Sequence, residues 1–135
     1  MLLRIFPRES CPKEIKEEFL ASRRAPKSFI DWHRERAEAE LTAICSHTGA
    51  QVHNQWMQRD GWFDGFEALH AIIETQKNRL LKIKWQEGQQ CFMRQAPNSS
   101  AWMTMRPEEM DCQSFSDIMH ATRDDSKNEV SQNDV

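Results

Sequence analysis

Residues 60–85, DGWFDGFEALHAIIETQKNRLLKIKW, carry the most regular hydrophobic pattern in the chain. Seven side chains recur there at alternating spacings of four and three residues: Trp62, Phe66, Leu69, Ile73, Gln76, Leu80 and Ile83. That spacing predicts a stripe along an α-helix that packs against another helix. Acidic residues near the start of the segment and basic residues near its end match the helix dipole. We therefore expect a long central helix over about residues 64–87, with the rest of the chain arranged around it.

Two helices are predicted before the central one. Ser10 and Pro12 favour a helix start, and that helix should end before Pro26, because the residue preceding a proline disfavours the α conformation. Ser28 is the expected N-cap of a second helix, and Gly49 suits the left-handed residue that ends it.

Short apolar segments at both ends of the folded region predict a small antiparallel sheet. Residues 2–6 are apolar apart from Arg4 and are followed at once by Pro7. Residues 90–95 and 101–106 flank the turn-forming sequence APNSS, which is typical of a β-hairpin. The predicted fold class is α+β and mainly helical, with three to four helices around the long central helix and this small sheet beside them.

Charge is distributed unevenly along the 135 residues. Residues 1–106 contain 16 basic and 13 acidic side chains, whereas residues 107–135 contain 2 and 8. We expect one globular domain over residues 1–121 and a disordered acidic tail over residues 122–135. A mildly basic body with an acidic tail lacks the strong positive charge that is typical of a dedicated nucleic-acid-binding domain.

Cysteine usage and hydropathy predict the compartment. The four cysteines are scattered without a close pair: Cys11, Cys45, Cys91 and Cys112. The sequence shows no signal peptide, and no apolar run approaches the length of a membrane-spanning helix. We therefore expect a cytoplasmic protein with reduced thiols and no membrane association.

Metal-ligating residue types occur, but not at the usual spacings. Cys45, His47 and His53 could supply zinc ligands, yet the paired spacings of small zinc modules are absent. Two carboxylate–histidine steps resemble the spacing used in di-iron bundles: Glu67 with His70, and Asp117 with His120. No nucleophile motif or glycine-rich phosphate loop is present. We predict no metal, cofactor or catalytic residue, and keep a small metal-dependent enzyme as a third hypothesis.

Protein binding is the function that the sequence favours most. The expected central helix carries apolar residues outside its stripe, more than one neighbouring helix could cover. A polar residue within the stripe, Gln76, is typical of positions that select a partner. The hypothesis is a small regulatory protein of inhibitor or adaptor type without catalysis. Its predicted partner-binding residues are Trp62, Phe63, Gln76, Leu81 and Trp85.

The alternative hypothesis is a nucleic-acid-binding accessory protein. Basic residues gather at the end of the expected central helix and between the first two helices: Arg23, Arg24, Lys77, Arg79, Lys82 and Lys84. Trp85, Trp102 and Phe92 are close to them in sequence and could stack on bases.

Overall fold

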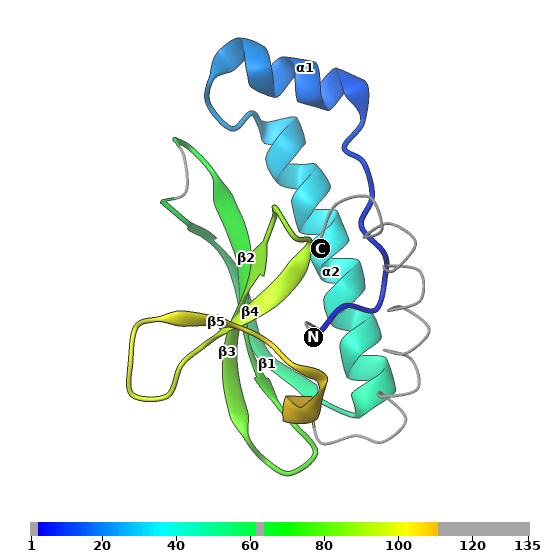
Figure 1. Cartoon of the computed structure of the whole chain (residues 1–135), viewed down its shortest axis with the longest axis vertical. Helices are drawn as coiled ribbons and strands as arrows, with labels where there is room; N and C mark the ends of the chain where they lie inside the picture. Colours follow the sequence, from blue (N-terminus) through cyan, green and yellow to red (C-terminus); the bar gives the residue numbers. More distant parts are fainter. Residues whose placement is uncertain (1–2, 62–63, 111–135) are drawn as a thin grey trace.

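Two helices and a five-stranded sheet make up the computed structural model, which describes residues 3–61 and 64–110. The elements in chain order are α1 (Lys13–Ser22), α2 (Lys27–Thr48), β1 (Gln51–Arg59), β2 (Glu67–Glu74), β3 (Leu80–Gln86), β4 (Cys91–Gln95), β5 (Trp102–Thr104) and the 3-10 turn η1 (Pro107–Met110). All strands pair antiparallel in chain order, and α2 lies across one face of the sheet (Figure 1).

The predicted helix over residues 64–87 is wrong, because this segment folds as the β2–β3 hairpin. A turn interrupts it in the middle. The backbone N–H of Thr75 donates to the carbonyl of Arg79 at 2.9 Å, and Asn78 adopts a left-handed φ of 63°. The described part of the chain is therefore α+β with two helices and five strands, and not mainly helical.

Two different strands produced the misleading helical spacing. In β3, buried Leu81, Ile83 and Trp85 alternate with lysines, which is the period of a strand with one buried face. In β2, residues 68–71 are all buried, so no alternation is visible. Joining one strand of each kind across a turn placed large residues at spacings of three and four.

The other predicted elements are present in part. Helices α1 and α2 lie where expected, and Gly49 ends α2 with a φ of 77°. Pro12 and Pro26 occupy the N-cap positions that we assigned to Ser10 and Ser28. The hairpin predicted over residues 90–95 and 101–106 corresponds to β4 and β5. The predicted domain and acidic tail, residues 1–121 and 122–135, extend beyond residue 110 and so lie partly or wholly outside the described residues.

The predicted strand over residues 2–6 is wrong for its described part, which instead lies as an irregular segment against α2. The buried Glu40 carboxylate of α2 accepts the backbone N–H groups of Ile5 and, at 3.1 Å, of Phe6. Burial raises the pKa of Glu40, against the opposing effect of these hydrogen bonds and of Arg4 and Arg36. A helix side chain therefore supplies the acceptors that a neighbouring strand would otherwise provide.

The main core lies between α2 and the sheet. Helix α2 contributes Ala37, Leu41 and Ile44, and the strands contribute Leu69, Ala71, Ile73, Leu81, Ile83, Trp85 and Phe92. A smaller cluster at the start of α2 contains Phe29, Phe66, Ala25 and Ala68, with residues of α1 against it. Both helices thus pack on one side, and the opposite face of the sheet is free of described helices (Figure 1).

Candidate functional site

A row of side chains crosses the sheet on the face opposite α2. Cross-strand partners run from Trp56 to His70, from His70 to Lys84, and from Lys84 to Met93. Directly paired residues of an antiparallel sheet lie on the same face. The flanking Leu69 and Ala71 of β2 pack in the core against α2, so the row lies on the other face.

Aromatic contacts join the members of this row. The rings of Trp56 and His70 stack at 5.8 Å between centroids, and Trp102 of β5 meets His70 edge-on at 6.0 Å. The Lys84 ammonium lies 4.7 Å from the centroid of the Trp102 ring, within the range of a cation–π contact. We name Trp56, His70, Lys84 and Trp102 the aromatic row.

The polar atoms of the aromatic row are held in place. The Lys84 ammonium lies 2.9 Å from the Asp60 carboxylate, and both side chains are largely buried. His70 Nδ1 lies 3.0 Å from the carbonyl oxygen of Ala68, which can only accept, so Nδ1 carries the ring proton. Burial is the main cause of the lowered pKa of His70. His70 and Lys84 therefore support the two half-buried tryptophans, whose exposed surface is available for stacking.

The predicted nucleic-acid-binding residues fall into two groups. Lys82 and Lys84 share the outer face of β3 with the aromatic row, and Lys77 and Arg79 lie at the β2–β3 turn. Arg23 and Arg24 instead follow α1, where Arg24 Nη1 lies 2.7 Å from an Asp64 carboxylate oxygen. The structure thus brings Lys82 and Lys84 together with one predicted stacking residue, Trp102. The other two, Trp85 and Phe92, are buried in the core.

The predicted partner-binding residues do not form one surface. Leu81 and Trp85 are buried between the sheet and α2. Gln76 is exposed in the β2–β3 turn, close to Gly49. Trp62 and Phe63 lie outside the described residues.

The possible metal ligands are also apart. Within residues 3–61 and 64–110, no group of three or more His, Cys, Asp or Glu side chains could hold a metal ion. His53 Nε2 lies 2.6 Å from the Glu74 carboxylate, while Cys45 is on α2 and His47 near its end. Glu67 and His70 lie on β2 and not on a helix, so their spacing does not place them one turn apart. Their proposed counterparts, Asp117 and His120, lie outside the described residues.

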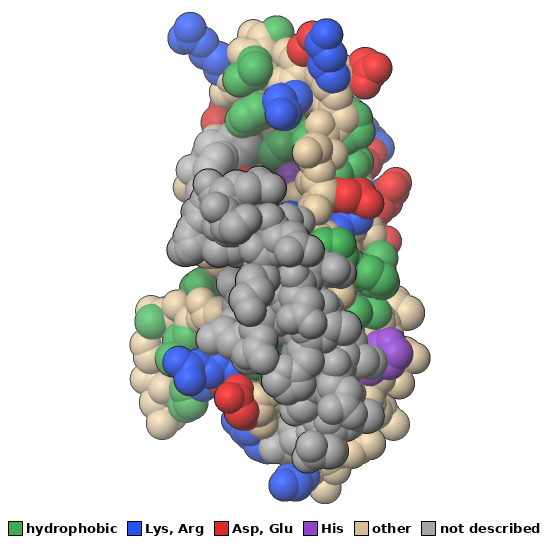
Figure 2. Space-filling view, turned by 45° about the vertical axis from the view of Figure 1, so that its right-hand side comes forward, with side chains coloured by type: hydrophobic (Ala, Val, Ile, Leu, Met, Phe, Trp, Pro, Cys, Tyr) green, Lys and Arg blue, Asp and Glu red, His purple; other side chains and the backbone are tan. Residues whose placement is uncertain are grey.

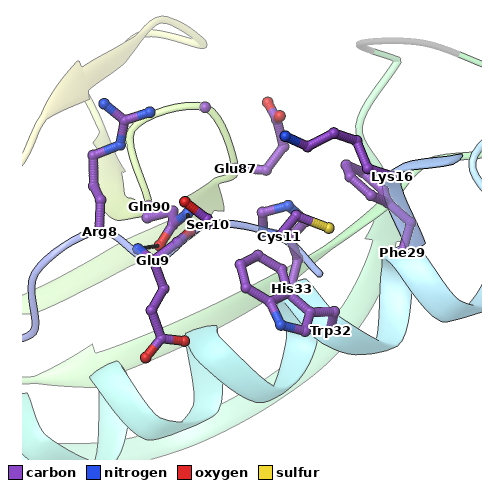
Figure 3. Close-up of a pocket in the computed structure, with 11 residues that line it drawn as sticks. Arg8, Glu9, Ser10, Cys11, Lys16, Phe29, Trp32, His33, Glu87 and Gln90 are labelled. Carbon is purple, nitrogen blue, oxygen red and sulfur yellow. Dashed lines mark hydrogen bonds between the residues drawn. The ribbon is translucent and has the colours of Figure 1, made fainter. Parts of the chain in front are cut away.

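A second candidate site is a pocket of about 500 Å³ between the start of the chain, both helices and the β3–β4 turn (Figure 3). We name it the N-terminal pocket. Its walls are Arg8, Glu9, Ser10, Cys11, Lys16, Phe29, Trp32, His33, Glu87, Gly88 and Gln90. Gln90 fixes one wall, because its side-chain nitrogen donates to the Glu9 carbonyl at 2.7 Å and its oxygen accepts the Glu9 N–H at 3.0 Å.

A cysteine and a histidine line this pocket, but their protonation does not suit nucleophilic catalysis. Trp85 Nε1 donates to His33 Nδ1 at 3.4 Å, so the proton of the neutral ring is on Nε2. Burial first, and then the Arg36 charge, lower the pKa of His33 to about 4. Burial also raises the pKa of the Cys11 thiol. Nε2–H can donate a hydrogen bond but cannot take the thiol proton as a base would.

The His33 imidazole is expected to stay neutral from about pH 8 down to about pH 5. Its pKa of about 4 is depressed below the ordinary 6.5, so its stabilising contribution is present above pH 6.5 and is lost as pH falls through 4. A two-dimensional NMR spectrum that correlates ring nitrogens with ring protons measures the protonation of His33 at each pH. The signals that are missing from the His33→Gln spectrum belong to His33. A His33 midpoint between about pH 6 and 7 would contradict the assignment.

Sequence patterns could not have revealed either site in full. Trp56 and Trp102 are far apart in sequence, and both contact His70 only in the folded sheet. The one usable signal was the alternation of Leu81, Ile83 and Trp85 with lysines, which would have placed Lys82 and Lys84 on an outer face.

Neither of the described helices has the length and apolar character needed to cross a membrane. Comparison of the chain with protein-family models, with curated protein sequences and with solved structures gives no match.

Proposed function

We propose that the chain binds single-stranded nucleic acid on the face of the sheet opposite α2. The observation that supports this proposal best is the aromatic row. The ring centroids of Trp56 and Trp102 lie 5.8 and 6.0 Å from that of His70, respectively. Aromatic side chains on an open sheet face stack on unpaired bases, and this stacking tolerates any base. Both tryptophans are half-buried, so each is held by the fold and still presents part of its ring.

Basic residues next to the aromatic row can meet the phosphates. Lys82, Lys77 and Arg79 are exposed, with Lys82 on the same face and the other two at the adjoining turn. Lys84 is not counted among these phosphate-binding residues, because its ammonium is paired with Asp60 and lies over the Trp102 ring. On the part of the helix-bearing side that Figure 2 shows, basic and acidic side chains are interspersed.

Fluorescence anisotropy of a labelled single-stranded oligonucleotide tests the proposal. Trp102→Ala is expected to weaken binding about tenfold, because a base–aromatic stack contributes about 1–3 kcal/mol. Lys82→Gln should weaken binding and also reduce its dependence on salt, because one phosphate contact is lost. Lys13→Gln, on an exposed lysine of α1, is the matched control and should change neither quantity.

Two outcomes would remove this function. One is the absence of binding to both DNA and RNA single strands at low salt. The other is binding that Trp102→Ala leaves unchanged while the variant keeps the circular-dichroism spectrum of the parent protein. Far stronger binding to duplex than to single strands would likewise contradict stacking on unpaired bases.

A protein partner of inhibitor or adaptor type remains our second candidate function, now on a different surface. Strand β1 is at the edge of the sheet, and residues 51–55 are all exposed. A groove of about 430 Å³ runs between α2 and this edge, lined by Leu41, Cys45 and Val52 among others. An open edge beside a groove suits an extended peptide that adds a strand.

Affinity capture from native cells distinguishes this second function. Val52→Lys places a charge on the edge and is expected to abolish the recovery of a strand-adding partner. Leu20→Ala, at an exposed apolar residue of α1, is the control. Equal recovery of every captured protein by both variants would exclude the β1 edge.

We also propose the cytoplasm as the place of action. Cys11, Cys45 and Cys91 are free thiols in the described part of the chain, in keeping with a reducing compartment. Fractionation of cells that express the protein would test this, and recovery in a membrane or secreted fraction would contradict it.

A further inference from the structure

We propose that the N-terminal pocket binds a small planar organic anion, such as an aromatic carboxylate. This inference does not depend on the proposed nucleic-acid function, because the pocket and the aromatic row share no residue. A volume of about 500 Å³ lies within the range of sites for small organic ligands. Four separate parts of the chain converge on it, as Figure 3 shows.

The walls of the N-terminal pocket are fixed before any ligand arrives. The two hydrogen bonds between Gln90 and the Glu9 backbone attach one wall to the β3–β4 turn. The Glu9 carboxylate lies 2.9 Å from Arg36 Nη1, which attaches the same wall to α2. A preformed pocket binds more tightly than one that must be ordered by its ligand, because less conformational entropy is lost.

The charge of the pocket favours an anion. Arg8 and Lys16 reach it from opposite sides (Figure 3), and neither has an ion pair within the described residues. Of the two acidic residues, Glu9 is engaged with Arg36. Glu87 is half-buried, accepts the Gly88 backbone N–H, and has a pKa raised mainly by burial. Within residues 3–61 and 64–110, two cations without an ion pair thus face a single acidic group.

His33 adds a neutral donor to these charges. Its Nδ1 is occupied by Trp85, and no residue in the described part of the chain accepts from its Nε2–H. His33 is 5% exposed and lines the pocket, so a carboxylate oxygen entering the pocket can accept a hydrogen bond from its Nε2–H. Hydrogen bonds from a buried donor to a charged acceptor are among the stronger kind.

The remaining wall is aromatic. Phe29 is buried and Trp32 half-buried, both on α2 one turn from each other, and both line the pocket. Flat apolar side chains beside two cations suit a ligand with an aromatic ring and a negative group. Inorganic phosphate has the charge but not the ring, so it should bind less well.

Isothermal titration calorimetry with 2-naphthoate tests the inference on the full chain. The neutral analogue 2-naphthamide and inorganic phosphate are the comparison ligands, and both are expected to bind at least about tenfold more weakly. The double variant Arg8→Gln/Lys16→Gln should lose at least about tenfold in naphthoate affinity. Lys13→Gln, which removes a charge from the same helix outside the pocket, should bind like the parent protein.

Glu87→Gln provides a test of the sign of the recognised charge. Removal of the one remaining acidic group should tighten naphthoate binding about two- to threefold. Weaker binding in this variant would show that a cationic or donor group is recognised, and would overturn the inference. So would equal affinity for naphthoate and naphthamide, naphthoate binding that survives in the double variant, or no binding to the parent protein. Failure of oligonucleotide binding would leave all these results unaffected.

Discussion

Trp85→Ala is expected to lower the free energy of unfolding by about 3–5 kcal/mol, as is usual for a large aromatic side chain removed from a core. Trp85 is 1% exposed and packs edge-on against Phe92 at 5.2 Å. Its indole N–H also donates to His33, so the variant leaves a cavity and removes a buried hydrogen bond. Urea unfolding followed by circular dichroism measures the change.

Two further variants test whether the loss of stability in Trp85→Ala comes from the burial of Trp85. Trp85→Phe keeps most of the volume and loses the donor, so its cost should be smaller, about 1–2 kcal/mol. Leu80→Ala, on the same strand but 63% exposed, should change stability by less than about 0.5 kcal/mol. A Trp85→Ala cost no larger than that of Leu80→Ala would place Trp85 at the surface, as the protein-binding hypothesis expected.

Glu40→Ala is expected to destabilise the protein by about 2–4 kcal/mol. The carboxylate is 2% exposed and accepts the N–H groups of Ile5 and Phe6, which the variant leaves without that acceptor. It also faces the charges of Arg4 and Arg36, and the loss of one partner from a buried charge cluster is costly. Glu38→Ala, at an exposed position on the same helix, is the control and should have little effect. An equal effect of the two variants would contradict this role of Glu40.

The pH dependence of stability gives a second measurement on the same residue. Because burial raises the pKa of Glu40 above its unfolded value, its contribution is fully present below the unfolded pKa. It decreases as pH rises through the folded pKa. The Glu40→Gln side chain cannot ionise. The free energy of unfolding of the parent protein should therefore fall relative to that of Glu40→Gln as pH rises. A difference independent of pH would contradict the raised pKa.

The helices could be predicted from the sequence better than the sheet could. The limits of α2 depend on local signals, Pro26 before it and Gly49 after it, and both act within a few residues. The identity of β2 depends on its neighbours. Leu69 and Ala71 are buried against α2, whereas His70 on the opposite face is covered by Trp56 and Trp102, so the usual alternation is absent.

The candidate sites illustrate the same limit. Lys82 and Lys84 could be assigned to a basic surface from composition alone, and they do share a face. Their neighbour Trp56 could not, because the contact with His70 depends on the register between β1 and β2. The N-terminal pocket depends on contacts between residues about 80 positions apart, such as Gln90 with Glu9.

The segment over residues 3–11 also has a place in the order of folding. Strands of a meander pair with their chain neighbours, whereas the hydrogen-bond partners of this segment lie between 29 and 102 positions away in the sequence. Closure of such long loops has a large entropic cost before any contact is gained, so the segment should dock last and detach first. The amides of Ile5 and Phe6 would then exchange with solvent through local opening, well before those of β2 and β3. Such opening would dismantle the N-terminal pocket while the sheet and its aromatic row stay folded.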